Sequence, residues 1–398
     1  MNDDLVNNLF RVLKNKPLVL VCSFQFFSML TGSMSRAVLI QFALDMEASV
    51  VEVGLISLLS GIINTICQVP FGILSDRIGR KVLILFSESV NCLTILARGL
   101  STTPLHLLII SPFGGLGGVE TPGLVAAVGD LTEPSDRPDA LSSFFIFSSV
   151  GLLIGPAAAG LLILFMPIRI VFFISAMIHV LDIILVFLIK GLKKPSGTGY
   201  KKDVVRVLKK KNMLVALDMR LSQGFFDSIR RTYIPIFAKQ ELGVSNALIA
   251  FLGSFEGISR IFIRFFMGKL IRKMTSKWLI VFIFSAEVAV GLLIPFSTGF
   301  HHLVIFACFA GLFHGIESPA SALLVSDSST HTERGFANSV LFLSMSSGSL
   351  APIVTIPVSV EWGLTSVFPI AAVLPALAAL VTIKLMEPLS IERGRVNS

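Results

Sequence analysis

Apolar segments of about 20 residues recur along almost the whole chain of 398 residues, and each is long enough to cross a hydrocarbon core of ~30 Å as a helix. Only 15% of the residues are charged, whereas a soluble domain carries about a quarter. A transmembrane β-barrel would instead show short segments of alternating polarity. The sequence therefore predicts an all-α, multi-pass membrane protein and argues against a soluble enzyme.

We expect twelve spans and no cleavable signal peptide, because the first apolar run is too long and lacks a small-residue cleavage site. The spans are expected at about 17–45, 50–75, 82–101, 104–130, 140–166, 168–190, 213–240, 246–268, 278–298, 301–327, 335–360 and 363–386.

The positive charges of the chain lie mainly on one side of the predicted membrane topology. Of 33 Lys and Arg residues, 24 fall in the loops and tails on the side of the two termini, two on the other side, and seven within spans. Cytoplasmic loops carry such an excess. The distribution predicts cytoplasmic termini in an inner (cell) membrane, and it explains the net charge of +8 without a nucleic-acid partner.

The cysteines show no metal-ligand spacing, and no nucleotide-binding loop or catalytic triad stands out. All four fall inside predicted spans, where we interpret them as small core residues: Cys22, Cys67, Cys92 and Cys308. We therefore expect no metal, no cofactor and no enzymatic activity.

One long polar segment, residues 190–212, divides the chain into a first six-helix bundle (1–189) and a second one (213–398). It contains nine basic residues and one acidic residue. Two interpretations stay open, a contact with anionic membrane lipid and a solvated linker that follows the positive-inside rule.

The two halves repeat each other in sequence. At an offset of 197, the segment 118–122 (GVETP) matches 315–319 (GIESP), and the same offset pairs Asp130 with Asp327 and Gly151 with Gly348. Duplicated halves pack about a pseudo-two-fold axis, and rocking them can open a shared site to either side of the membrane.

The segment 72–81, GILSDRIGRK, lies between the second and third predicted spans. It resembles the signature G-x-L-x-D-R-x-G-R-K of the major facilitator superfamily. Together with the repeat, this resemblance covers essentially the whole chain. It implies a latch that holds the outward-facing state, made by Gly72, Asp76, Arg77, Gly79, Arg80 and Lys81 with Asp130 as the acidic partner.

The fifth predicted span contains Gly151, Gly155, Pro156 and Gly160. This pattern is similar to a motif of the proton-coupled exporters of the superfamily, although Ala159 replaces one glycine. The exporters' arginine in the fourth span is also missing, because Ser111 stands at its position. Small residues here also suit ordinary close helix packing.

Polar residues form a stripe on one face of the first span and another on the seventh. Gln25 and Arg36 belong to the first, and Gln223, Asp227 and Arg231 to the second. In the superfamily fold both spans line the central cavity. Arg36 and Arg231 would then face each other and bind a carboxylate or phosphate. The alternative is pairing within the protein, for example between Arg231 and Asp227.

Glu120 and Glu317 are the candidate proton carriers, since each precedes a proline by two residues inside a predicted span. Burial favours the neutral form of a carboxylate. The alternative role is a hydrogen bond at a helix kink. Other charges within the spans, including Glu88, His179 and Asp182, receive no role from sequence.

The sequence thus predicts a monomeric secondary transporter that works by alternating access, with proton-coupled export of a small organic compound as the leading hypothesis. Transport of an anionic metabolite by the arginine pair is the main alternative. A non-transporting membrane sensor or scaffold is an alternative of another class. The sequence leaves the substrate, the direction of transport and the coupling ion open.

Overall fold

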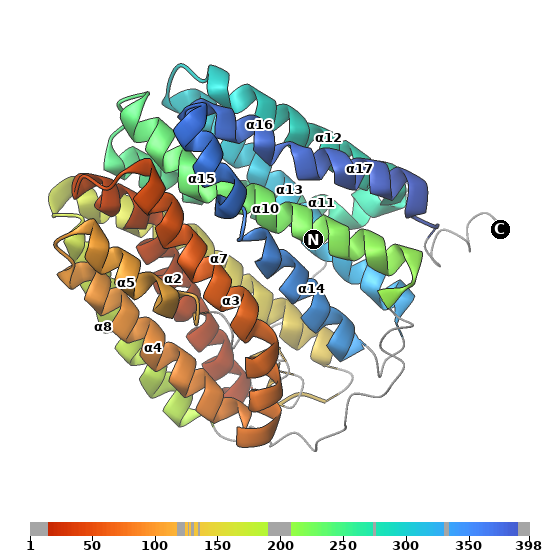
Figure 1. The fold of residues 1–398 in the computed structure, drawn as a ribbon. Helices are drawn as coiled ribbons and strands as arrows, with labels where there is room; N and C mark the ends of the chain where they lie inside the picture. Colours follow the sequence, from red (N-terminus) through yellow and green to blue (C-terminus); the bar gives the residue numbers. More distant parts are fainter. Residues whose placement is uncertain are drawn as a thin grey trace. The chain divides into compact units, whose positions relative to one another are not determined.

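The computed structural model describes residues 15–117, 124–125, 127–128, 131–133, 136–189, 208–273, 276–329 and 334–388. Helices account for nearly all of them (Figure 1). The first half contains α2 (Lys16–Asp45), α3 (Val50–Ile78), α4 (Arg80–Leu100), α5 (Pro104–Gly114), α7 (Arg137–Phe165) and α8 (Arg169–Leu188). The second half contains α10 (Lys211–Gln240), α11 (Asn246–Lys273), α12 (Ser276–Leu293), η1 (Ile294–Phe296), α13 (Phe300–Ser328), α14 (Arg334–Gly348), α15 (Pro352–Glu361), η2 (Leu364–Ser366), α16 (Val367–Ala371) and α17 (Val373–Leu385).

Within this described part, ten helical segments are long and apolar enough to cross a membrane. Two further helices correspond to the other predicted spans. The described part of α5 is short, and α10 is 30 residues long but carries several charged residues. The prediction of an all-α membrane fold is confirmed.

Proline and glycine set several helix boundaries. The eleventh predicted span is interrupted between α14 and α15, where Pro352 begins the new helix because proline fits a first helical turn but donates no backbone N–H. Gly79 separates α3 from α4 with a φ of 100°, a conformation in which a Cβ would be strained.

Contacts divide the chain into two compact units. Unit 1 comprises residues 1–47, 66–197 and 245–254, and unit 2 comprises residues 48–65, 198–244 and 255–398. The start of α3 therefore belongs to unit 2, and the start of α11 to unit 1. The division at 1–189 and 213–398 is drawn from the sequence repeat and stays a prediction.

Each unit repeats the same packing scheme. In unit 1, α2 packs on α7 and α8, and α4 packs on α8 and α5. In unit 2, α10 packs on α14, α13 and α17, and α12 packs on α17 and α13. Figure 1 shows α12 and α17 side by side. The two buried cores are apolar, with Phe24 and Phe144 in unit 1 and Met219 and Phe284 in unit 2.

Two polar details also recur at an offset of 196. Lys81 Nζ donates to the carbonyl oxygens of Phe187 and Ile189 at the end of α8, and Lys277 Nζ donates to that of Ile383 near the end of α17. A lysine thus satisfies carbonyl groups that a helix end leaves unpaired. Likewise, the backbone N–H of Thr102 donates to His106 Nδ1, and that of Thr298 to His302 Nδ1.

Glycines of α7 let this helix approach its neighbours closely. A Cβ at Gly151 would lie 2.5 Å from the Phe26 carbonyl oxygen of α2, and a Cβ at Gly155 would collide with Ser33 Oγ. Further along α7, a Cβ at Gly160 would lie 2.9 Å from the Phe251 ring. A Cβ at Gly253 would lie 2.8 Å from Pro156 Cγ. The glycines of the fifth-span motif therefore lie at helix contacts.

We predict that Gly155→Val lowers the stability of the protein by about 1–3 kcal/mol, because the added side chain overpacks the α2–α7 contact. Thermal unfolding of the purified protein in detergent measures the change. Ile154→Phe is the matched control, since it adds bulk at an exposed neighbour. Equal Tm values for Gly155→Val and the control would contradict the close packing.

Candidate functional site

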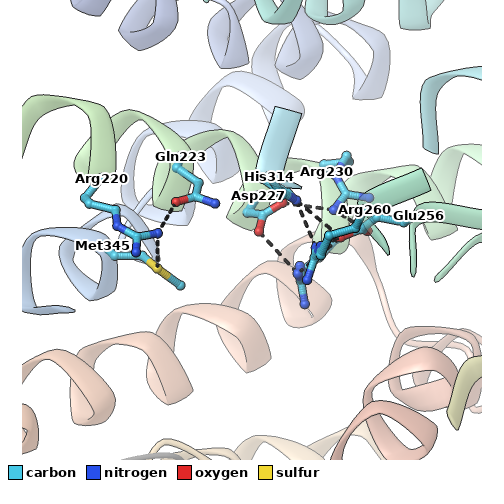
Figure 2. A network of polar contacts seen from close by, with 9 residues as sticks. Arg220, Gln223, Asp227, Arg230, Glu256, Arg260, His314 and Met345 are labelled. Atoms are coloured by element: carbon cyan, nitrogen blue, oxygen red, sulfur yellow. Dashed lines mark hydrogen bonds and ion pairs between the residues drawn. The ribbon is translucent and has the colours of Figure 1, made fainter. Parts of the chain in front are cut away.

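One face of α10 carries the polar residues of the candidate site, at helical spacings of three and four. Arg220, Gln223, Asp227, Arg230 and Arg231 all come from this helix. Figure 2 shows them in two groups, Arg220 with Gln223 and, further along α10, a larger network around Asp227. The contacts of these two groups lie within unit 2.

The centre of the network is Arg230, which is buried between two carboxylates. Its Nη2 lies 2.9 Å from Asp227 Oδ1 and 2.7 Å from Glu256 Oε2 of α11. Arg231 follows it in sequence but is half exposed, and its Nη2 lies 3.2 Å from Asp227 Oδ2. Charge-assisted hydrogen bonds of this kind are stronger than hydrogen bonds between neutral groups. Because Arg230 is buried, removing either partner of a pair would leave an uncompensated charge.

His314 of α13 links the two carboxylates from the other side. Its Nε2 lies 3.1 Å from Asp227 Oδ1, while its Nδ1 lies 3.0 Å from Arg260 Nη2 and 3.3 Å from Glu256 Oε1. Arginine only donates and an ionised carboxylate only accepts. The two contacts of Nδ1 therefore need opposite protonation states of this nitrogen, so a proton at this atom would exchange one contact for the other.

Glycines on α13 place His314 against α11. A Cβ at Gly311 would collide with the Glu256 carbonyl oxygen, and a Cβ at Gly315 would lie 3.0 Å from the Arg260 carbonyl oxygen. Glu256 and Arg260 of α11 thus both lie against glycines of α13, where α13 has no side chain. This close approach brings the imidazole within reach of Glu256 and Arg260, whose own ion pair joins adjacent turns of α11.

The second group lies nearer the start of α10. Arg220 Nη1 donates to Gln223 Oε1 at 2.7 Å, and Arg220 Nη2 donates to Ser318 Oγ of α13 at 3.4 Å. Arg220 also interacts electrostatically with Glu317. α10 and α13 are therefore joined by polar contacts over several turns.

Two buried acids stand next to this network. Glu317 of α13 and Glu287 of α12 are both fully buried. Their carboxylate oxygens accept no hydrogen bond from any other described residue, and the two side chains can form a hydrogen bond with each other once one is protonated. The two groups interact electrostatically with each other. Two adjacent ionised carboxylates repel, and a proton shared between them would remove that repulsion.

The predicted polar stripe of the first span lies on α2 in unit 1. Gln25 is buried, and its Nε2 donates to Ser148 Oγ of α7 at 3.3 Å. Arg36 is exposed, and its guanidinium lies against Gly32 of the preceding turn. The facing of Arg36 and Arg231 stays a prediction, and the contact of Arg231 with Asp227 is the internal pairing described above.

Part of the predicted latch can be located. Gly79 forms the turn between α3 and α4, Arg80 begins α4, and Lys81 contacts the end of α8. The surroundings of Gly72 and the side chains of Asp76 and Arg77 lie outside the described part of the structure, as do the residues Asp130 and Glu120. Their predicted roles as latch and proton carrier stay predictions.

Sequence reasoning missed His314 as a member of the site and gave Glu256, Arg260 and Glu287 no role. His314 and Glu317 are three residues apart and share a helix face, which was the one available signal. The contacts of Glu256 and Glu287 depend on how α11 and α12 pack against α10 and α13, and helical spacing within one element cannot reveal such contacts.

The family comparison decides the identity of the fold. The model of the Major Facilitator Superfamily matches residues 21–284 and 219–396. The chain belongs to this family. Members of the superfamily are transporters and not enzymes, and the apolar helices of the described part fit the multi-pass membrane architecture of this family.

Similar bacterial proteins bear transport names. Multidrug resistance protein 2 of Bacillus subtilis is 26% identical over 263 residues, which cover 62% of this chain and 64% of that protein, just under two thirds. Multidrug resistance protein MdtG of Salmonella arizonae is 26% identical over 337 residues, which cover 80% of this chain and 81% of that protein.

Solved transporter structures share the fold. The nucleoside transporter NupG aligns with a TM-score of 0.76 at 13% identity and covers 94% of this chain and 100% of its own. The peptide transporter POT aligns with a TM-score of 0.72 at 14% identity and covers 92% and 93%. The likeness at these identities concerns the fold alone.

We predict that Arg230→Gln and Arg231→Gln differ sharply although the residues are neighbours. The side chain of Arg230 is 9% exposed, and its removal leaves two carboxylates without their buried partner. We expect the free energy of unfolding to fall by about 3–5 kcal/mol. The side chain of Arg231 is 48% exposed, and its ion pair contributes less than about 1 kcal/mol. Thermal unfolding in detergent compares them, and equal losses of stability would contradict the described network.

Proposed function

We propose that this transporter exports a small organic compound in exchange for protons. The observation that carries the proposal is the pair Glu287 and Glu317, two fully buried carboxyl groups that interact with each other and accept no hydrogen bond from any other described residue. Charged groups inside membrane spans are energetically unfavourable and mark proton relays or ion pathways. Such a pair is suited to taking up and releasing one proton.

The charges around the pair suggest how a proton would act on the site. Four arginines belong to the network on α10 and α11: Arg220, Arg230, Arg231 and Arg260. Four acids accompany them: Asp227, Glu256, Glu287 and Glu317. The set is neutral when all four acids are ionised, and uptake of one proton adds one positive charge.

That added charge would redistribute contacts that already exist. Glu317 interacts with Arg220 and His314 when it is ionised, so its neutralisation would weaken both interactions. The freed His314 ring can exchange its contact with Arg260 for one with Glu256. A positively charged substrate and a proton would then compete for the same negative charge, which couples their movements in opposite directions.

The named relatives support export over uptake. Two of them are called multidrug resistance proteins, a name that fits removal of small compounds from a cell. The distribution of Lys and Arg supports cytoplasmic termini and an inner-membrane location. The glycine-rich contacts of α7 agree with the resemblance to proton-coupled exporters.

A second candidate function is transport of an anionic metabolite. The observation in its favour is the local excess of arginine around Asp227 and Glu256, where three guanidiniums meet two carboxylates. Arg231 is half exposed and could bind a carboxylate or phosphate group. In this case Arg231 would contribute to affinity and Glu317 would not carry the coupled proton.

We predict that Glu317→Gln abolishes proton-driven transport. The purified protein is reconstituted into liposomes with an acidic interior. The liposomes are then given either the lipophilic cation ethidium or the organic anion benzoate. In the wild-type protein, ethidium uptake accompanies proton release. In Glu317→Gln, ethidium uptake and proton release both fall at least tenfold, because a neutral amide cannot carry the proton. Exchange of ethidium across the membrane in the absence of a pH gradient persists in this variant.

Glu241→Gln is the control for this experiment, since Glu241 is exposed at the end of α10. Ethidium uptake at a rate that does not depend on the pH gradient would contradict proton coupling. Benzoate movement that is lost in Arg231→Gln and kept in Glu317→Gln would instead establish the anion transporter.

A further inference from the structure

A second buried polar cluster lies in unit 1, away from the network on α10. Glu88 comes from α4, and His179 and Asp182 come from adjacent turns of α8. All three side chains are completely buried. His179 Nδ1 lies 3.0 Å from Glu88 Oε2 and 3.4 Å from Asp182 Oδ2, so one nitrogen and two oxygens converge on a small volume.

The converging atoms form no regular hydrogen bonds with one another. His179 Nδ1, Glu88 Oε2 and both oxygens of Asp182 make no hydrogen bond with any described residue, although two of these distances are short. The approach directions do not suit an N–H···O bond. No Lys or Arg among the described residues forms an ion pair with Glu88 or Asp182. Buried charges in native proteins are paired or bind metals.

The surroundings of His179 fix which ring nitrogen carries the proton. Its Nε2 lies 3.0 Å from Thr31 Oγ1 of α2, and the Thr31 hydroxyl donates to the Phe27 carbonyl oxygen at 2.9 Å. Because that hydroxyl proton is engaged, Thr31 accepts from Nε2–H. When the ring is neutral, this tautomer directs the Nδ1 lone pair at the two carboxylates. Metal-binding histidines are usually held by such an outer hydrogen bond.

The second ligand is oriented in the same way. The Ser28 hydroxyl of α2 donates to Glu88 Oε1 at 3.2 Å, so Oε2 is the oxygen that faces His179 Nδ1. The separations of 3.0 and 3.4 Å are those of ligand atoms bound about 2.1 Å from one ion at angles of roughly 90–110°. A neutral imidazole and two carboxylates carry two negative charges, which a divalent cation neutralises.

We propose that Glu88, His179 and Asp182 bind one divalent transition-metal ion of the Zn²⁺ or Mn²⁺ class. Imidazole combined with carboxylate favours these ions over Mg²⁺ and Ca²⁺, which prefer all-oxygen sites. The ion joins α4 to α8, and Ser28 and Thr31 of α2 hold the ligands in place. The sequence contains no spacing that predicts this site, because Glu88 and His179 are 91 residues apart.

The test measures metal binding directly. The full-length protein is purified in detergent, stripped with a chelator and dialysed against Zn²⁺, Mn²⁺ or Mg²⁺. His301 and His302 are neighbouring imidazoles outside the cluster, so both are replaced by Ala in every sample. We expect about one Zn²⁺ per chain by elemental analysis, a higher Tm with Zn²⁺ or Mn²⁺, and no such rise with Mg²⁺.

Three variants locate the ion. Asp182→Asn removes a ligand with little change of shape and abolishes stoichiometric Zn²⁺ binding. Thr31→Val removes the outer hydrogen bond and weakens Zn²⁺ affinity about 10–100-fold. Glu317→Gln, a buried carboxylate of unit 2, keeps full binding. Bound Co²⁺ gives a visible absorption spectrum that Thr31→Val alters.

The proposal is overturned if the stripped protein binds no Zn²⁺ or Mn²⁺ at stoichiometric level. It is also overturned if Asp182→Asn binds Zn²⁺ as tightly as the parent protein in which only His301 and His302 are replaced. A Tm that depends on pH but not on any of the metals would assign the cluster to a bound proton instead. Loss of binding in Glu317→Gln would place the ion in unit 2 and would equally overturn it.

Discussion

The low dielectric of a membrane makes every charge inside a span dependent on a partner, and this constraint organises the polar part of the transporter. An ionised side chain at the bilayer centre is unfavourable by about 2.5–3.5 kcal/mol on insertion scales. The network on α10 meets the constraint with ion pairs, since Arg230 lies between Asp227 and Glu256. These pairs join α10 to α11, and His314 joins both to α13, so the same interactions that permit the charges help to fix where the helices lie.

Close helix contacts are the second requirement, because ion pairs act only over a few ångströms. Gly311 and Gly315 bring α13 against the backbone of α11, and His314 reaches Glu256 only because of this approach. In unit 1, Gly151 and Gly155 bring α7 against α2 in a comparable way. Small residues are the usual means of close contact in membranes, where apolar burial does not draw helices together. The glycines and the polar networks are therefore parts of one arrangement.

The fold was predictable from sequence to a large extent, and the site only in part. Apolar segments and the GILSDRIGRK motif predict the helices and the family, because both signals lie within single stretches of chain. The stripe Gln223, Asp227 and Arg231 was found for the same reason. His314 and Glu287 were not, because their contacts arise between helices. The breaks at α14–α15 and α16–α17 also went unpredicted. Pro352 and Pro375 lie in the first turn of the helix that follows each break, and such a proline allows a helix to continue or to stop depending on its neighbours.

The two halves show how corresponding helices that each bury an acid, at different positions along the helix, acquire different chemistry. Glu88 lies on α4 and Glu287 on α12, which occupy corresponding places in the repeated packing scheme, and both are completely buried. In unit 1 the neighbour of Glu88 is His179 of α8, a neutral ligand that completes a site for a fixed cation. The corresponding helix, α17, contains no histidine or acid. Glu287 therefore meets Glu317 of α13 instead. Two adjacent acids are suited to binding a proton reversibly, whereas two acids with an imidazole are suited to binding a metal ion tightly. Under the two proposals, a fixed cation would rigidify unit 1, and the exchangeable proton would be confined to unit 2.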